Sequence, residues 1–278
     1  MLRIKLNPQL TKDERAAIAR YLTQHGRLNA QEWLVALRAF DLLSGSTVTV
    51  GEQRETFAAI YARLVEQKHA DDFIEQLLSL DKNVQAKGER LKASVARTIA
   101  QELADAGLYR RSVPESRYLL AYCYYWWDAF ARGYIFEAQI YQDLEQSGVE
   151  FLAHNIRDPI ERRSRSDLIV LGRQGDVKTS TYFLTTARTR VLRHDFYIVR
   201  LYDVRHRRYQ IAVMMTEEAW RDVNGDTVPA ALEEAACSFP QTARVKYAGG
   251  HLIVVDYDVW KQRVKTRQRE EYDDRETA

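Results

Sequence analysis

The sequence contains few of the residues that mark disulfide-linked or zinc-binding chains. Only two cysteines, Cys123 and Cys237, occur among 278 residues, and neither belongs to a CxxC pair or a Cys/His cluster. Both lie in apolar surroundings, so we expect reduced, buried thiols. The histidines form no HExxH pattern, and the short turn Gly172–Gly175 lacks the Lys-Ser/Thr of a P-loop. These absences argue against a disulfide scaffold, a zinc enzyme and a P-loop protein.

Long apolar runs are also missing. The most hydrophobic stretch, 118–127, is too short to span a bilayer and is followed by Asp128 and Arg132. The first six residues are followed at once by polar residues, which is not the pattern of a signal peptide. We therefore expect a cytoplasmic protein with no membrane partner. Because 41 Lys and Arg face 39 Asp and Glu, any basic surface must be local.

Apolar residues make up 46% of the chain, which is enough for a packed core in one large or two ordinary domains. We expect an α/β (α+β) protein in two parts. An all-helical N-terminal region should cover 1–112, and an α/β domain should cover 113–278. No internal repeat or low-complexity linker separates them, and the sequence leaves the oligomeric state open, a homo-oligomer included.

Helix-start signals organise the first part. Thr11 with Glu14, and Asn29 with Glu32, are capping-box patterns that begin two helices. The predicted helices cover 12–25, 30–43, 52–67, 69–80 and 84–106. This region carries no chemistry that its residues identify.

The next helix begins near Ser112 and runs to about Gln146, and its apolar stripe includes one acid. Glu137 is followed by Tyr141 at i+4 and Leu144 at i+7, so its carboxylate lies on the stripe. A buried carboxylate is costly without a partner, and a cation would be one. An exposed edge position or a salt bridge to an arginine are the alternatives.

A hairpin follows a charged loop, and its second strand carries an acid and a base. Asp176 and Lys178 lie two residues apart, so strand alternation places both on one face. A turn at Gly172-Arg173 would set Asp167 opposite Lys178, whereas a turn at Arg173-Gln174 would spread Asp167 from Asp176. Two carboxylates and an ammonium at a strand pair suit a hard divalent cation beside a phosphate.

The pattern Asp167…Asp176-Val177-Lys178 resembles the PD-(D/E)xK (restriction-endonuclease-like) nuclease superfamily. In that superfamily a Gly…Glu…Leu…Gly helix precedes the first strand and lends its Glu to the metal. The matching positions here are Gly133, Glu137, Leu144 and Gly148, followed by a predicted strand over 149–154. The resemblance covers about 130–215. It departs from the family after the DxK strand, where only a short helix candidate, 187–193, is present.

The resemblance implies a restriction-endonuclease-like core with a central mixed β-sheet flanked by helices. It also implies an endonuclease-type hydrolase that cleaves phosphodiester bonds in DNA with Mg²⁺ or Mn²⁺. Glu137, Asp167 and Asp176 would hold the metal, the Val177 carbonyl would add a ligand, and Lys178 would position water or stabilise charge on the phosphate. Asp158, beside Pro159, competes with Asp167 for the role of the first acid; we prefer Asp167 because it leads directly into an apolar strand.

Basic residues near the motif form a predicted nucleic-acid-binding set. They lie in the loop before Asp167 and in the segment after the DxK strand, and a charged solvent-exposed surface is the alternative. The set comprises Arg162, Arg163, Arg165, Arg188 and Arg190. Two other functions remain open. The chain could be a catalytically inactive nuclease-fold protein that binds nucleic acid or acts as a scaffold, or a helical regulatory protein in which D…DxK is accidental.

Overall fold

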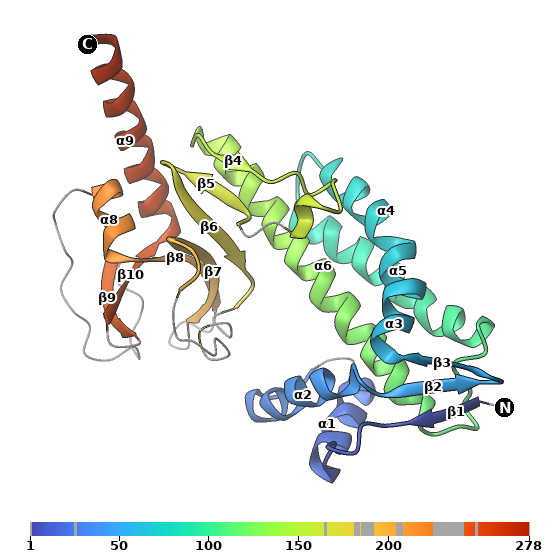
Figure 1. The fold of residues 1–278 in the computed structure, drawn as a ribbon. Helices are drawn as coiled ribbons and strands as arrows, with labels where there is room; N and C mark the ends of the chain where they lie inside the picture. The colour runs from blue at the N-terminus through green and yellow to red at the C-terminus, as the bar shows by residue number, and fades with distance from the viewer. Residues whose placement is uncertain are drawn as a thin grey trace. The chain divides into compact units, whose positions relative to one another are not determined.

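The computed structural model describes residues 2–24, 27–163, 166–180, 184, 192–203, 208–224, 242–247 and 250–277. The chain forms two compact units, Met1–Ile135 and Phe136–Ala278 (Figure 1). The sequence placed the change between residues 112 and 113, whereas the units meet inside the long helix α6, Ser116–Ser147. This helix begins at Ser116 rather than near Ser112, because residues 111–115 form turns instead. Among the described residues, no helix combines the length and apolar character needed to cross a membrane.

Helices form most of the first unit, and their caps follow the sequence. Both predicted capping boxes are confirmed: Thr11 and Asn29 accept hydrogen bonds from the backbone three residues on, and Glu14 and Glu32 return them. The helices are α1 (Lys12–Thr23), α2 (Ala30–Leu43), α3 (Phe57–Tyr61), a π-helical turn (Ala62–Glu66), α4 (Gln67–Leu78) and α5 (Val84–Asp105).

The all-helical prediction for residues 1–112 is wrong, because the unit also contains an antiparallel three-stranded sheet. Its strands are β1 (Leu2–Lys5), β2 (Thr47–Val50) and β3 (Gln53–Thr56), in the order β1-β2-β3. The chain turns from β2 to β3 at Gly51, whose φ of 61° suits a two-residue turn that begins with glycine. The first turn of the helix predicted over 52–67 is therefore a strand.

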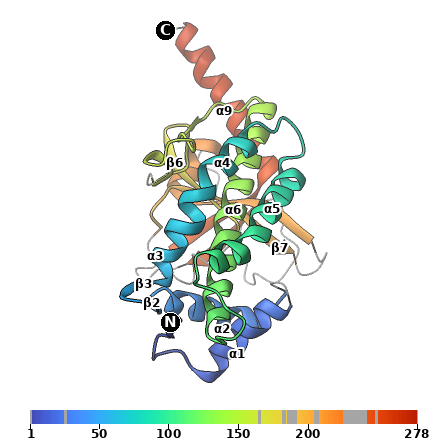
Figure 2. The same cartoon turned by 90° about the vertical axis from the view of Figure 1, so that its right-hand side faces the viewer.

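The core of this unit is built on the aromatic start of α6. Tyr125 stacks on Phe40 of α2 with ring centroids 4.0 Å apart, and Trp127 packs edge-on against Phe73 of α4 at 5.3 Å. The Trp127 indole N–H donates to the carbonyl of Lys92 in α5 at 3.0 Å. Figure 2 shows α4 and α5 running beside α6. The aromatic stretch thus serves as core, because each ring finds a packing partner from a neighbouring helix.

A seven-stranded mixed sheet organises the second unit. Its strands form six neighbouring pairs. Strands β6 and β7 run parallel, and the other five pairs are antiparallel. The order is β4-β5-β6-β7-β8-β10-β9. The strands are β4 (Leu152–Ala153), β5 (Leu168–Val170), β6 (Arg173–Lys178), β7 (Phe196–Asp203), β8 (Arg208–Met215), β9 (Thr242–Tyr247) and β10 (Gly250–Asp256). The predicted mixed α/β character is confirmed.

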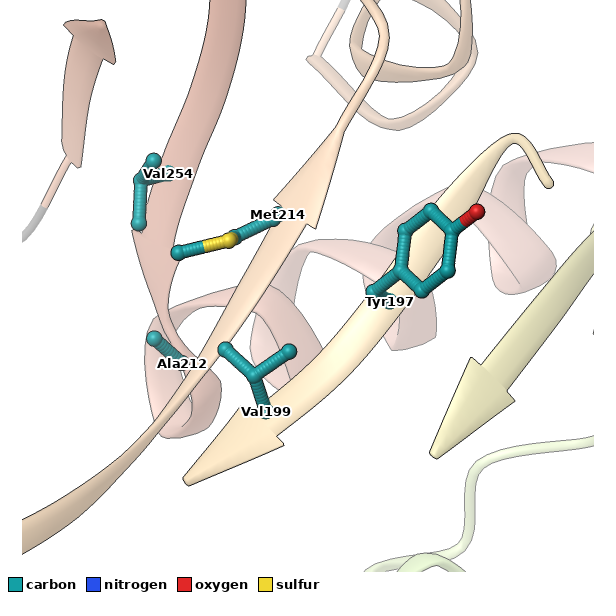
Figure 3. Close-up of a cluster of buried hydrophobic side chains, with 5 residues drawn as sticks. All are labelled: Tyr197, Val199, Ala212, Met214 and Val254. Atoms are coloured by element: carbon teal, nitrogen blue, oxygen red, sulfur yellow. The ribbon is translucent and has the colours of Figure 1, made fainter. Parts of the chain in front are cut away.

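The two faces of this sheet are covered differently. On one face, strands β7, β8 and β10 present an apolar cluster of Tyr197, Val199, Ala212, Met214 and Val254 (Figure 3). The other face packs on helices α8 (Glu217–Asn224) and α9 (Tyr257–Thr277), where the rings of Phe196 and Trp260 lie 5.6 Å apart. Because side chains alternate along a strand, consecutive residues within β6, and likewise within β7, point to opposite faces of the sheet.

Candidate functional site

The hairpin that carries the motif turns at neither of the two predicted positions. Its register pairs Val170 with Arg173 and Leu168 with Gly175, so the two turn residues are Leu171 and Gly172. Both have positive φ, 49° and 72°, which is the pattern of a type I′ turn. A leucine in the left-handed region is uncommon, and nothing in its residue type predicted this turn.

This register changes the neighbour of Asp167. Asp167 lies just before β5, where its N–H donates to the carbonyl of Gly175 at 3.0 Å. Its side chain reaches two residues further along β6, since Oδ2 accepts from the N–H of Val177 at 2.7 Å. The prediction that Asp167 opposes Lys178 is therefore wrong. Asp167 instead lies beside Asp176, and the two carboxylates interact directly.

Asp176 and Lys178 share one face of β6, as strand alternation predicts. The Lys178 ammonium forms a hydrogen-bonded ion pair with Asp176 Oδ1, and His194 Nδ1 lies 3.6 Å from Oδ2. Gly175, on the other face, leaves its side-chain position to the ring of Phe196. In the parallel pair with β7, Asp176 is opposite Tyr197, so it borders the apolar cluster of Figure 3.

Burial makes Asp176 an unusual carboxylate. The residue is 4% exposed. Loss of solvent raises its pKa to about 7, and the neighbouring Asp167 adds to that increase while Lys178 opposes it. Near neutral pH the Asp176 carboxyl is therefore only partly ionised, and a cation bound beside it would favour the ionised form.

Glu137 lies on the buried stripe of α6, as its spacing predicts, and is 7% exposed. Its partners among the described residues are a tyrosine and a histidine. The hydroxyl oxygen of Tyr141, one helical turn on, lies 2.7 Å from Glu137 Oε1 and the same distance from the backbone carbonyl oxygen of Asp167, so its single proton is shared between these two acceptors. Burial and the Glu137 charge raise the pKa of Tyr141, so the phenol stays protonated and remains a donor. Tyr141 thus ties the helix acid to the hairpin.

His154 completes the group, and the sequence did not identify it. Its Nε2 lies 2.8 Å from Glu137 Oε1, and its Nδ1 lies 3.2 Å from the carbonyl of Ser166 and 3.8 Å from Asp167 Oδ1. Burial opposes the charged imidazole, but the nearby carboxylates of Glu137 and Asp167 and the Ser166 carbonyl outweigh it and raise the His154 pKa. One ligand atom each from Glu137, His154 and Asp167 lie within 4.8 Å of one another.

The structure therefore brings Glu137, Asp167, Asp176 and Lys178 into one neighbourhood. Glu137 and Asp167 share a group with His154, and Asp176 joins it through Asp167. Val177 contributes its N–H to Asp167. The missed residues, Tyr141 and His154, carry weak signals. Tyr141 lies at i+4 from Glu137, and His154 lies opposite Asp167 across β4 and β5, where its N–H donates to the Asp167 carbonyl at 3.1 Å.

Asp158, the competing acid, has a local role instead. Its Oδ1 accepts from the N–H of Ile160 at 2.8 Å, which stabilises the turn before a short 3₁₀ helix, Glu161–Arg163. Of the predicted basic set, Arg162 belongs to this helix and is half-buried. The side chain of Arg163, and residues Arg165, Arg188 and Arg190, lie outside the described part of the structure.

The donor set fits a divalent cation. Carboxylate oxygens are the ligands of Mg²⁺ and Mn²⁺, and an imidazole nitrogen is a common ligand of transition-metal ions. A lysine beside such a site can meet an anionic substrate. Comparison of the chain with models of known families, with curated proteins and with solved structures finds no match to any of them.

Proposed function

We propose that this chain is a metal-dependent nuclease that hydrolyses phosphodiester bonds in DNA, with a core of the restriction-endonuclease-like type. One observation carries the proposal: a buried acid, Asp176, lies between a second acid and a lysine, and the second acid belongs to a three-residue group able to hold a metal ion. That DNA rather than RNA is the substrate comes only from the resemblance of Asp167…Asp176-Val177-Lys178 to PD-(D/E)xK nucleases.

In this proposal the acids hold the metal ion, and Lys178 acts on the phosphate or on water. Glu137, Asp167 and Asp176 would hold Mg²⁺ or Mn²⁺, with the Val177 carbonyl as a further ligand. The bound cation would supply Lewis-acid stabilisation of the charge that grows on the phosphate. Tyr141 orients Glu137 through its hydrogen bond. The Lys178 side chain is 40% exposed, so its ammonium can leave Asp176 for a phosphate oxygen or a water molecule.

A specific observation favours the alternative of an inactive nuclease-fold protein that binds nucleic acid. Glu137 already has His154 as a partner, and Asp176 already has Lys178. Both acids thus have protein cations beside them. If these pairs persist when divalent ions are added, the site is a structural polar cluster and the chain can still bind nucleic acid.

Single-turnover cleavage separates the two readings. The parent should cut single-stranded, duplex or branched DNA only with Mg²⁺ or Mn²⁺. Lys178→Ala should abolish most cleavage while DNA and metal affinity stay nearly intact, because phosphate charge grows only in the transition state. Asp176→Ala should lose metal affinity and cleavage together. Lys82→Ala, an exposed lysine of the first unit, is the matched control.

The outcomes that would contradict the proposal are distinct. If Lys178→Ala cuts as fast as the parent, Lys178 has no catalytic role. If the parent binds DNA but cuts neither DNA nor RNA with either ion, the inactive binding protein is the better description.

A further inference from the structure

His154 lies where its side chain could bind a metal ion together with the neighbouring acids. Its side chain is only 8% exposed and lies between two carboxylates, Glu137 and Asp167. The ring comes from the chain that follows the two-residue strand β4, and its backbone N–H is anchored to the Asp167 carbonyl. Burial and this backbone hydrogen bond keep the imidazole beside both acids.

The two ring nitrogens have different neighbours, and this fixes their roles. Nδ1 lies 3.2 Å from the Ser166 carbonyl, an acceptor that requires a proton on Nδ1. In the neutral ring Nε2 then carries a lone pair, and Glu137 Oε1 lies 2.8 Å from that nitrogen. Two lone pairs at that distance repel each other unless a proton or a metal ion lies between them. A backbone carbonyl on the far nitrogen is also the arrangement found behind histidines that bind metals.

The separation itself suits shared coordination. Two ligand atoms that each lie about 2.1 Å from one ion, at right angles to each other, are about 3 Å apart. The 2.8 Å between His154 Nε2 and Glu137 Oε1 is close to that value. One ligand atom of Asp167 lies within 4.8 Å of both partners.

We propose that His154 is a nitrogen ligand of the metal site, together with Glu137 and Asp167, and that it makes the site prefer Mn²⁺ to Mg²⁺. The inference rests on the metal site of the proposed function and names the ion that the site takes. Mg²⁺ takes oxygen ligands and gains little from imidazole. The affinity of nitrogen ligands rises along the transition-metal series, and Mn²⁺ accepts both oxygen and nitrogen ligands.

The experiment measures binding of the two ions to the full chain, without reference to cleavage. Mn²⁺ affinity is read by electron paramagnetic resonance, and Mg²⁺ affinity by calorimetry and by its competition with Mn²⁺. His154→Gln should weaken Mn²⁺ binding by about tenfold or more while leaving Mg²⁺ binding nearly unchanged. His69→Gln is the matched control, because His69 also pairs with a glutamate, Glu102 at 3.0 Å, in the other unit.

A second measurement uses the parent protein and does not depend on how the variant folds. Pulsed electron paramagnetic resonance of the Mn²⁺-loaded parent should show hyperfine coupling to a directly bound nitrogen. Absence of that coupling, or an equal loss of both ions in His154→Gln, would overturn the inference. Nitrogen coupling in a protein that cuts no nucleic acid would support His154 as a ligand and overturn only the nuclease proposal.

Discussion

Replacing Asp176 by asparagine should stabilise the metal-free protein at neutral and alkaline pH. Burial of the carboxylate, with Asp167 beside it, raises its pKa from 3.8 to about 7. A carboxylate that is harder to ionise in the folded state costs stability as pH rises from the lower value to the higher one. The difference from 3.8 to about 7 corresponds to about 4 kcal/mol above pH 7.

Asparagine keeps a polar group of the same shape but carries no charge, so most of this cost should disappear. We expect Asp176→Asn to raise the free energy of unfolding of the second unit by about 2–4 kcal/mol at pH 8.5, in the presence of a chelator. Near pH 2.5 the parent carboxyl is almost fully protonated in both states, so the two proteins should be nearly equally stable. The parent alone should regain stability when Mn²⁺ is added, because only it keeps the ligand.

Hydrogen exchange of the β6–β8 amides reports the second unit without interference from unfolding of the first. The matched control is Asp72→Asn, an exposed aspartate of α4, which should change stability by no more than about 0.5 kcal/mol. A variant that is no more stable than the parent at pH 8.5 would refute the reasoning. A gain of the same size at both pH values would also refute it, since the benefit would then not come from the charge.

Three further predictions concern the close approach at Gly175, the ion pairs of Glu102 and the predicted basic set. Gly175→Ala should destabilise the second unit by about 1–3 kcal/mol, because the added methyl group would lie 2.1 Å from the buried ring of Phe196. The urea midpoint of unfolding measures this loss of stability. An unchanged midpoint would show that the ring moves aside without cost. Burial disfavours the Glu102 charge, but hydrogen bonds from Lys68 and His69 outweigh this effect and lower the pKa of Glu102. Glu102→Gln should therefore cost about 1 kcal/mol of stability at pH 7 and progressively less as pH falls below 4.5. A loss of stability that does not depend on pH would contradict this. Neutralising the predicted basic set should reduce the salt dependence of DNA binding by about 0.9 in log–log slope for each phosphate contact removed, whereas an unchanged slope would make these arginines a solvated surface. That set is Arg162, Arg163, Arg165, Arg188 and Arg190.

Local patterns in the sequence predicted those features that depend on neighbours within one element. The capping boxes at Thr11 and Asn29 are of this kind, as is the shared face of Asp176 and Lys178. The buried position of Glu137 followed from helical spacing. Each of these inferences needs only the period of a helix or a strand, and tertiary packing did not override it.

Features that depend on pairing between elements were missed. The turn at Leu171-Gly172 requires two residues with positive φ, and leucine gives no sign of that, so the register and the partner of Asp167 were wrong. The strand Thr47–Val50 alternates and is followed by a glycine turn, but it is short, and its partner β1 comes from the far N-terminus. His154 enters the group only through the pairing of β4 with β5.

The strands hold the backbone of Asp176 and Lys178 more firmly than the backbone of His154 and Asp167, before any ligand binds. Strand β6 pairs with β5 over residues 173–175 and with β7 over residues 175–178, so the backbone of Asp176 and Lys178 cannot shift without breaking the ladder to β7. His154 follows a strand of only two residues at the edge of the sheet, and Asp167 lies just outside the end of β5. Ion binding should therefore immobilise the edge half around a half that is already rigid. The entropy lost on binding would be concentrated at the edge, and lengthening β4 by stabilising substitutions should tighten the site without touching a ligand.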